Sequence, residues 1–207
     1  MSGGGNESGA SPGGEPIPLH QVETPEARLY ADLVGTAHDL DRVRLFIDAW
    51  FQTEDLVLQD ALFTAALIAY RRCFTTGVRA QLDPAELTAL GNDAAEFHRY
   101  LCEQASKLAA HPVNAFEQVK IGVVVQKEQV AGIGPMLARM MSFQREGFVQ
   151  WRSLVDYLVN RVLEPQLVQA AEAALQSARD LPLSQIVSAP TLGMMAPHHS
   201  QAGKRRR

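Results

Sequence analysis

The chain has little cysteine and no long apolar run. Its 207 residues include two cysteines, Cys73 and Cys102, whose spacing matches no zinc-binding motif. We therefore expect two reduced thiols rather than a metal site or a disulfide. A helix that crosses a bilayer needs about 20 apolar residues in succession, so we expect no membrane partner. The N-terminus lacks the apolar segment of a secretory signal, and we expect a cytoplasmic location.

An excess of either charge is also missing. Lysine and arginine number 19 against 23 aspartate and glutamate residues, which leaves a formal net charge of -4. This balance gives the chain as a whole no electrostatic attraction to nucleic acid or to an anionic membrane. An anionic partner would have to bind at a local basic patch. No residue pattern indicates a cofactor, and a hydrophobic content of 46% suffices for the core of one domain.

Both ends of the chain are predicted to be disordered. Residues 1–22 are rich in Gly, Ser, Pro and Glu, a composition that buries little apolar surface. Residues 183–207 form the second predicted tail, which has this character from about Ser188. Its last four residues, 204–207, are basic and indicate a solvated end, with a weak phosphate contact as the alternative. The domain between the tails is predicted to cover residues 23–182.

The first helix is predicted from a start signal and an apolar stripe. Thr24 is a capping residue, Pro25 suits the first turn, and Glu26 complements the positive end of the helix. Apolar residues then recur at steps of three and four, as they do on one face of a helix. They are Leu33, Ala37, Leu40, Val43, Ile47 and Trp50.

Two further helices follow. The second is predicted to begin near Thr53, and its almost entirely apolar middle, residues 61–70, indicates a central position with neighbours on several sides. Gly77 favours its end. Residues 83–86, Asp-Pro-Ala-Glu, combine the cap, proline and acid of a third helix start. Gly-Asn at 91–92 favours a break that divides this third helix in two.

The pattern then changes to that of a β-hairpin. Alternating apolar residues at 119–125 predict a strand, and a polar turn at 126–129 precedes a return strand at 130–133. Because a two-stranded hairpin alone is marginally stable, we expect it to lean on the helices. A last helix is predicted from about Ser142, with Pro165 as a kink or interruption. The predicted fold class is all-α, an up-down bundle of four to five helices with a small β-hairpin before the last helix.

A His-Pro-x-Asn motif ends the third helix. Pro112 disfavours a helical conformation at the residue before it, so the helix is expected to stop at His111. His111 and Asn114 are then displayed at a helix end, where polar groups can meet a ligand. His111 is interpreted either as a proton-transfer or phosphate-contacting group or as a structural histidine. Asn114 either holds the imidazole ring or forms the turn after the helix.

Basic residues gather at the end of the second helix. Arg71, Arg72 and Arg79 can cradle a phosphate, or they can complement the negative end of the helix dipole, which is the interpretation we favour. His98 shares a face of the third helix with Ala105, seven residues on. It can line a groove beside His111, or it can be a partly buried structural histidine.

The segment 105–117, Ala-Ser-Lys-Leu-Ala-Ala-His-Pro-Val-Asn-Ala-Phe-Glu, resembles the end of the third helix in bacterial proteins of the HEPN superfamily. The family segment reads Arg-x-Lys-His-x-Ala-His-Ser-x-Asn-x-Phe-Glu. The positions that agree are Lys107, Ala110, His111, Asn114, Phe116 and Glu117. The segments that begin at Arg71 and at His98 are also similar, so the resemblance spans about residues 24–180.

The resemblance implies a small all-α fold and a metal-independent endoribonuclease that acts as a homodimer. In that family an arginine and a histidine six residues apart face a groove between subunits. The imidazole moves protons, and the guanidinium stabilises the phosphate as negative charge builds up. This chain keeps the histidine as His111 but has Ala105 at the arginine position, on the apolar stripe. We expect Ala105 to pack, and Lys107 lies too far round the helix to replace the arginine.

Two functions remain open. The first is a non-catalytic homodimer, formed through the helices that flank His111, which binds RNA or a nucleotide. Its candidate binding residues are Asn114, Lys107, His98, Arg71, Arg72 and Arg79. The second is a weak endoribonuclease in which His111 works with an arginine from outside the motif. A cysteine nucleophile is not indicated, because Cys102 and His98 stand four residues apart without a third group to orient the base. We favour the first.

Overall fold

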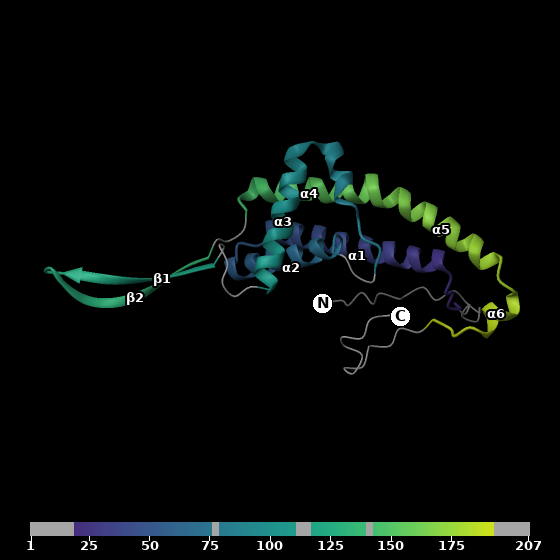
Figure 1. Cartoon of the computed structure of the whole chain (residues 1–207), viewed down its shortest axis with the longest axis horizontal. Helices are drawn as coiled ribbons and strands as arrows, with labels where there is room; N and C mark the ends of the chain where they lie inside the picture. The colour runs from purple at the N-terminus through teal and green to yellow at the C-terminus, as the bar shows by residue number, and fades with distance from the viewer. Residues whose placement is uncertain (1–18, 76–78, 111–116, 140–142, 193–207) are drawn as a thin grey trace, which may run out of the picture.

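The computed structural model describes residues 19–75, 79–110, 117–139 and 143–192. It is mostly helical, with an antiparallel two-stranded hairpin (Figure 1). The elements in chain order are α1 (Pro25–Gln52), α2 (Leu56–Arg72), a 3-10 helix (Pro84–Leu90), α3 (Asn92–Ala110), β1 (Glu117–Gln126), β2 (Gln129–Arg139), α4 (Arg145–Tyr157), a π-helical stretch (Leu158–Leu163), α5 (Glu164–Arg179) and α6 (Leu183–Ser188). The predicted helical class is confirmed. The hairpin was predicted before a single last helix, and in the structure it is followed by α4, α5 and α6. None of the described helices is both long and apolar enough to cross a membrane.

The helix starts follow the local sequence chemistry. The Thr24 hydroxyl accepts from the N–H of Ala27 at 3.2 Å and caps α1, as predicted. Asp55 caps α2 through the N–H groups of residues 57 and 58, two residues later than the predicted start at Thr53. Asp83 caps the 3-10 helix, which ends at Gly91 with φ 97°. Only glycine adopts that conformation without strain, so the predicted break before α3 is confirmed.

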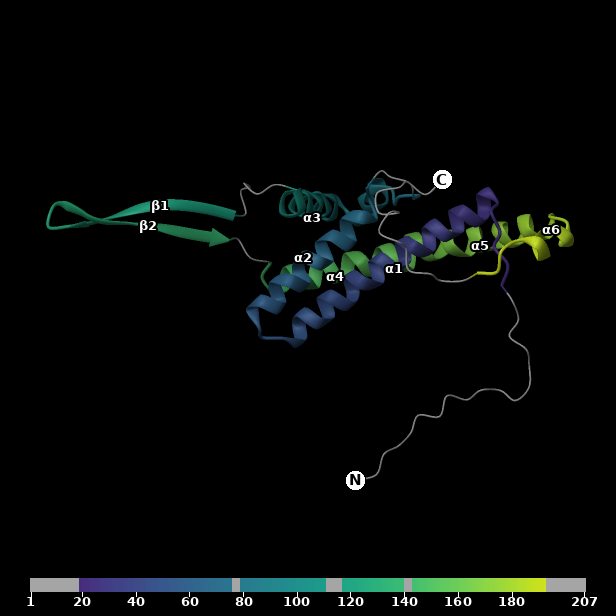
Figure 2. The same cartoon turned by 90° about the horizontal axis from the view of Figure 1, so that it is seen from below.

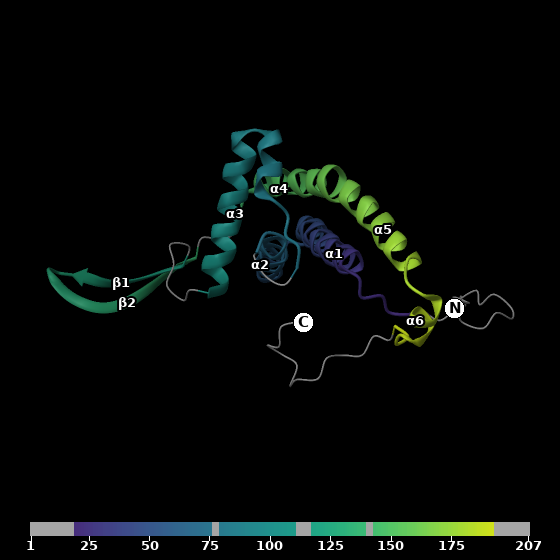
Figure 3. The ribbon, with the colours of Figure 1, turned by 45° about the vertical axis from the view of Figure 1, so that its right-hand side comes forward.

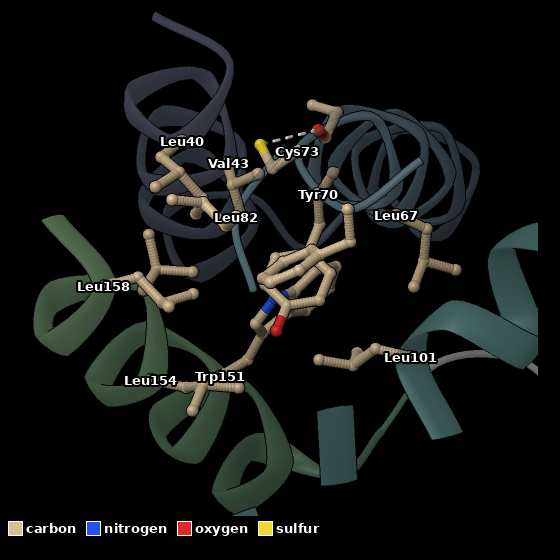
Figure 4. Close-up of a cluster of buried hydrophobic side chains, with 14 of the residues drawn as sticks. Leu40, Val43, Leu67, Tyr70, Cys73, Leu82, Leu101, Trp151, Leu154 and Leu158 are labelled. Atoms are coloured by element: carbon tan, nitrogen blue, oxygen red, sulfur yellow. Dashed lines mark hydrogen bonds between the residues drawn. The ribbon is translucent and has the colours of Figure 1, made fainter. Parts of the chain in front are cut away.

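The core lies where α1, α2, α3 and α4 meet (Figure 4). The side chains that converge there include Leu40, Val43, Leu67, Tyr70, Leu101 and Trp151, each at most 1% exposed. Full burial of a side chain of this size contributes about 2 kcal/mol to the free energy of folding. The packing of this cluster therefore determines how the helices cross. In the predicted stripe of α1, four residues are buried, and Ala37 and Trp50 pack against the core.

The last long helix passes through Pro165 without interruption. Pro165 has no N–H, and its ring crowds the carbonyl of Arg161, four residues earlier. The π-helical stretch Leu158–Leu163 lies immediately before this point, and its wider hydrogen-bonding pattern lets the chain continue from α4 into α5. The helix arches over α1 (Figure 3), so the predicted kink takes the form of a π-helical stretch rather than a break.

The hairpin projects from the helical body instead of leaning on it (Figures 1 and 2). β1 and β2 pair over ten residues, from Glu117–Arg139 to Gln126–Gln129. Apolar side chains along both strands are exposed, among them Val123 and Ile133. The expectation that the hairpin leans on the helices is therefore wrong. Alternation of apolar residues predicts a strand but does not identify the surface that covers it.

Segments near the two ends of the chain meet beside α6. His20 and Thr191 form an antiparallel bridge, and the N–H of Leu192 donates to the carbonyl of Leu19 at 2.7 Å. The described structure thus continues to residue 192, where the composition predicted a tail without structure from residue 183. Backbone pairing between distant segments stabilises α6, and composition alone does not reveal such pairing. The remainder of the predicted tails, 1–18 and 193–207, lies outside the described residues.

Candidate functional site

Two of the three predicted arginines hold a buried carboxylate. Asp39 on α1 is 3% exposed, and its Oδ2 lies 3.3 Å from Arg72 Nη2 and 3.3 Å from Arg79 Nη1. A carboxylate at this depth needs opposite charge, which forked guanidinium groups supply. The Arg79 guanidinium lies over Gly35, where an added Cβ would stand 3.0 Å from Nη1. Gly35 therefore makes room for this contact.

These contacts join α1 to the end of α2 and to the segment that follows it. Asp32, about two helical turns nearer the start of α1, extends the same junction, because its Oδ2 accepts from the N–H of Ala80 at 2.9 Å. A phosphate would have to compete with Asp39 for Arg72 and Arg79. Neither the phosphate cradle nor the helix-dipole interpretation describes this arrangement, since the negative charge comes from a neighbouring helix.

His98 is a buried histidine with a tyrosine partner. It is 8% exposed, and its Nδ1 lies 2.9 Å from the Tyr70 hydroxyl on α2. Burial raises the pKa of Tyr70 well above its usual value, so the phenol stays protonated. Because Tyr70 then donates to Nδ1, we assign the proton of the neutral ring to Nε2, which faces the Cys102 sulfur at 3.7 Å. The geometry matches the structural alternative for His98.

The stability of the fold should decrease as the pH falls from about 6.5 to about 4. Burial, assisted by the positive charge of Arg71, lowers the pKa of His98 from 6.5 to about 4. Over this range the unfolded chain binds a proton that the folded chain excludes, so the stabilisation is complete above pH 6.5 and lost near pH 4. We expect the loss to be on the order of 2 kcal/mol.

Urea unfolding followed by circular dichroism, at a series of pH values, measures this effect. The control is His98→Gln, whose amide keeps hydrogen-bonding capacity without titrating. Carboxylates titrate in both proteins, so the difference between the two curves isolates His98. Equal pH dependence of the wild type and His98→Gln would contradict the prediction.

Cys102 and Arg71 complete this side of the α2–α3 contact. Burial raises the pKa of the Cys102 thiol, although the nearby positive charge of Arg71 acts in the opposite direction. Cys73 is buried more deeply, and burial raises its pKa to about 12. Both cysteines are free thiols, as predicted. A protonated thiol beside a neutral imidazole is not an activated nucleophile, so the pair of Cys102 and His98 provides packing and a weak polar contact.

Ala105 lies in the core. It is 3% exposed and packs in the same cluster as Leu101, which confirms that the residue at the family's arginine position is a packing residue. Lys107 is half-buried on the following turn of α3. His111 and Asn114 lie outside the described residues, so their roles and their distance from Arg71, Arg72 and Arg79 stay predictions.

Two residues of this site were not singled out in the sequence, Asp39 and Tyr70. Asp39 stands one residue before Leu40 and four before Val43, so it lies on the buried face of α1. A carboxylate on an apolar stripe, together with three arginines elsewhere, is a signal for a buried ion pair. Tyr70 is the single tyrosine of α2, a largely apolar helix, and nothing in the sequence links it to His98.

The described residues do not assemble a catalytic constellation. They contain no group of three or more His, Cys, Asp or Glu side chains that could hold a metal ion. A cavity of about 300 Å³ lies between residues 21–23 and residues 181–190. None of the predicted site residues lines it. What the site offers a ligand is the positive charge of Arg71, next to the helix that leads to His111.

The likeness to HEPN proteins rests on the 105–117 segment and on the shorter segments that begin at Arg71 and at His98. The helical class agrees with that likeness, but many unrelated families share it. No family model, no curated protein and no solved structure matches the chain.

Proposed function

We propose that the chain is a non-catalytic HEPN-like protein, an up-down helical bundle that forms a homodimer and binds the phosphates of RNA or of a nucleotide. The burial of Ala105 is the observation that carries this proposal. At this position the resembling family has the arginine that stabilises the transition state. Loss of one such group typically lowers a rate by about a hundred- to a thousandfold.

Two of the three predicted arginines are not available as a substitute, because Arg72 and Arg79 are bound to Asp39. His98 is neutral at physiological pH and donates toward a thiol sulfur rather than toward solvent. These features support binding without cleavage, because a phosphate can still be attracted while its transition state is not stabilised.

Arg71 is the residue that supports phosphate binding. It is half-buried at the end of α2 and lies against α3, and no carboxylate among the described residues forms an ion pair with it. A partly desolvated guanidinium attracts a phosphate more strongly than an exposed one does. Lys107 lies further along α3, toward the predicted site at His111 and Asn114.

Arg71→Gln should weaken the binding of labelled single-stranded RNA about three- to tenfold and should lower the dependence of log K on log salt by about 0.7. The control is Arg28→Gln, which removes the same charge from an exposed position. Fluorescence anisotropy at several salt concentrations measures both, and a parallel series with a labelled mononucleotide separates the two ligand types.

The same samples are assayed for cleavage by gel electrophoresis. We expect intact RNA with the wild type and with His111→Ala. RNA cleavage by the wild type that is lost in His111→Ala would establish the endoribonuclease instead. Equal affinity of wild type, Arg71→Gln and Arg28→Gln would refute phosphate binding at Arg71.

A further inference from the structure

The hairpin Glu117–Arg139, called the arm here, carries one continuous apolar face. In its register Val123 pairs with Ile133 and Val125 pairs with Val130, and paired residues of antiparallel strands point to the same side. The face consists of Ile121, Val123, Val125, Val130, Ile133 and Pro135. Its aliphatic side chains are 58 to 73% exposed, so nothing in the described chain covers it.

The opposite face of the arm has few apolar side chains. Gly122, Gly132 and Gly134 lie there, with Val124 and Met136 as its apolar side chains. A Cβ added at Gly132 or Gly134 would meet nothing within 4 Å, so this side is open as well. The two faces therefore differ in their apolar side chains, and only the first presents a continuous row that can pack against a hydrophobic surface.

An uncovered arm of this kind has a partner. A two-stranded ribbon is marginally stable in water, and exposed edges and apolar faces promote association. Val123, Val124 and Val125 form an exposed run of three apolar residues, a pattern that soluble surfaces avoid unless it is functional. The arm is therefore an interaction surface.

Charge excludes two classes of partner. Among the side chains of residues 120–136 only Lys120, Lys127 and Glu128 are charged, which is too little positive charge for a nucleic acid. Lys127 and Glu128 form the tip of the arm, with φ 51° and 60°, as in the tight turns that join twisted strands. Two charges at the tip oppose its insertion into a bilayer. The partner is a protein surface, and the tip remains in water.

The size of the arm decides between two ways of pairing with a second copy. At about 3.3 Å per residue and about 4.8 Å between strands, ten residue pairs give a face on the order of 300 Å². Two arms stacked face to face would bury about 600 Å² in total, below the roughly 1,000 Å² that a stable interface needs. Two arms that each cover the body of the other copy would bury about 1,200 Å² in total, which is enough.

The helical body also has exposed apolar residues. Leu56, Val57 and Leu58, at the start of α2, are 66%, 80% and 47% exposed and form another run of three exposed apolar residues. The turn between α1 and α2 lies at the end of the body from which the arm projects (Figures 1 and 2). A two-fold axis beside this end can therefore place each arm on the other copy's α2 in one symmetric contact.

We propose that the arm is a dimerisation arm whose apolar face packs on residues 56–58 of a second copy, while the second copy's arm packs on the first. The proposal rests on the homodimer of the proposed function and gives it a contact surface, but it does not depend on RNA binding. This contact differs from the one predicted from the sequence, which placed the dimer on the helices that flank His111.

The first experiment makes the same change, valine to lysine, on each face of the arm in separate variants. Sedimentation equilibrium of the full chain at micromolar concentrations should give a dimer. Val123→Lys, on the apolar face, should weaken dimerisation at least about tenfold. Val124→Lys, the matched control on the opposite face, should leave it within about threefold of the wild type. Equal dissociation by the two variants would refute a face-specific contact, as would a monomeric wild type.

The second experiment tests reciprocal exchange. Val57→Lys, on the body, should dissociate the dimer as Val123→Lys does. A mixture of the two variants should associate more than either variant alone but more weakly than the wild type, because one of the two contacts, about 600 Å², is unaltered. If Val57→Lys stays dimeric, or if the mixture associates no more than either variant alone, arm exchange is wrong. A dimer that resists all three substitutions would preserve the proposed homodimer and refute only this contact, and RNA binding is measured separately.

Discussion

Ala105→Arg should prevent the chain from folding cooperatively, or destabilise it by at least about 4 kcal/mol. The position is 3% exposed and belongs to the cluster that joins α3 to the rest of the core. A guanidinium placed there would have to be desolvated without a carboxylate partner, and its long side chain would displace neighbours such as Leu101. Each of these costs alone is comparable with a large part of the stability of a small domain.

The matched control is Ala173→Arg, the same substitution at an exposed position of α5. It should change the free energy of unfolding by no more than about 0.5 kcal/mol. Urea unfolding followed by far-ultraviolet circular dichroism measures both variants. A cooperative transition for Ala105→Arg within about 1 kcal/mol of the wild type would show that the side chain escapes to solvent, and that a family-like arginine could be restored at this position.

Completing the arginine and histidine motif of the resembling family would take more than one substitution. If position 105 were exposed, the single substitution Ala105→Arg would complete the motif with His111. Because Ala105 is a core residue, an arginine at this position would point into the core and not into the groove that the resemblance implies. Placing an arginine in such a groove would then require the rest of the buried stripe to change, including Leu101, which belongs to the same buried cluster.

Features that depend on neighbouring residues in the chain could be predicted from the sequence. The caps at Thr24 and Asp83, the break at Gly91 and the hairpin turn each involve a contact within a few residues. Capping side chains and glycine act through local geometry, so their positions specify where a helix begins or ends. Periodicity likewise identified the buried face of α1.

Features that depend on distant pairing could not be predicted in the same way. Tyr70 and His98 are 28 residues apart, and Asp39 and Arg79 are 40 apart. A sequence pattern shows that His98 and Asp39 fall on helix faces, but it does not show which helix covers them. The projecting arm is the opposite case. Its alternation implied a covering surface, and the described residues do not provide one.

Removing both arginines that bind Asp39 should destabilise the fold more than removing Asp39 itself. In the double variant Arg72→Gln/Arg79→Gln, a carboxylate that is 3% exposed loses its positive partners, and we expect a loss of about 3 to 5 kcal/mol. In Asp39→Asn no charge remains buried. The arginine side chains are 48% and 46% exposed, so they can be hydrated, and the loss should be about 1 to 2 kcal/mol.

The triple variant, Asp39→Asn with both arginine substitutions, separates the buried charge from the lost contacts. It should be more stable than the double arginine variant, because the uncompensated carboxylate is gone, and the difference measures the coupling between the charges. Arg28→Gln is the control, since its partner Glu23 is exposed and 3.8 Å away, and it should cost at most about 0.5 kcal/mol. If Asp39→Asn proves the more damaging change, the carboxylate contributes through hydrogen bonds that an amide cannot replace, and charge burial does not govern this junction.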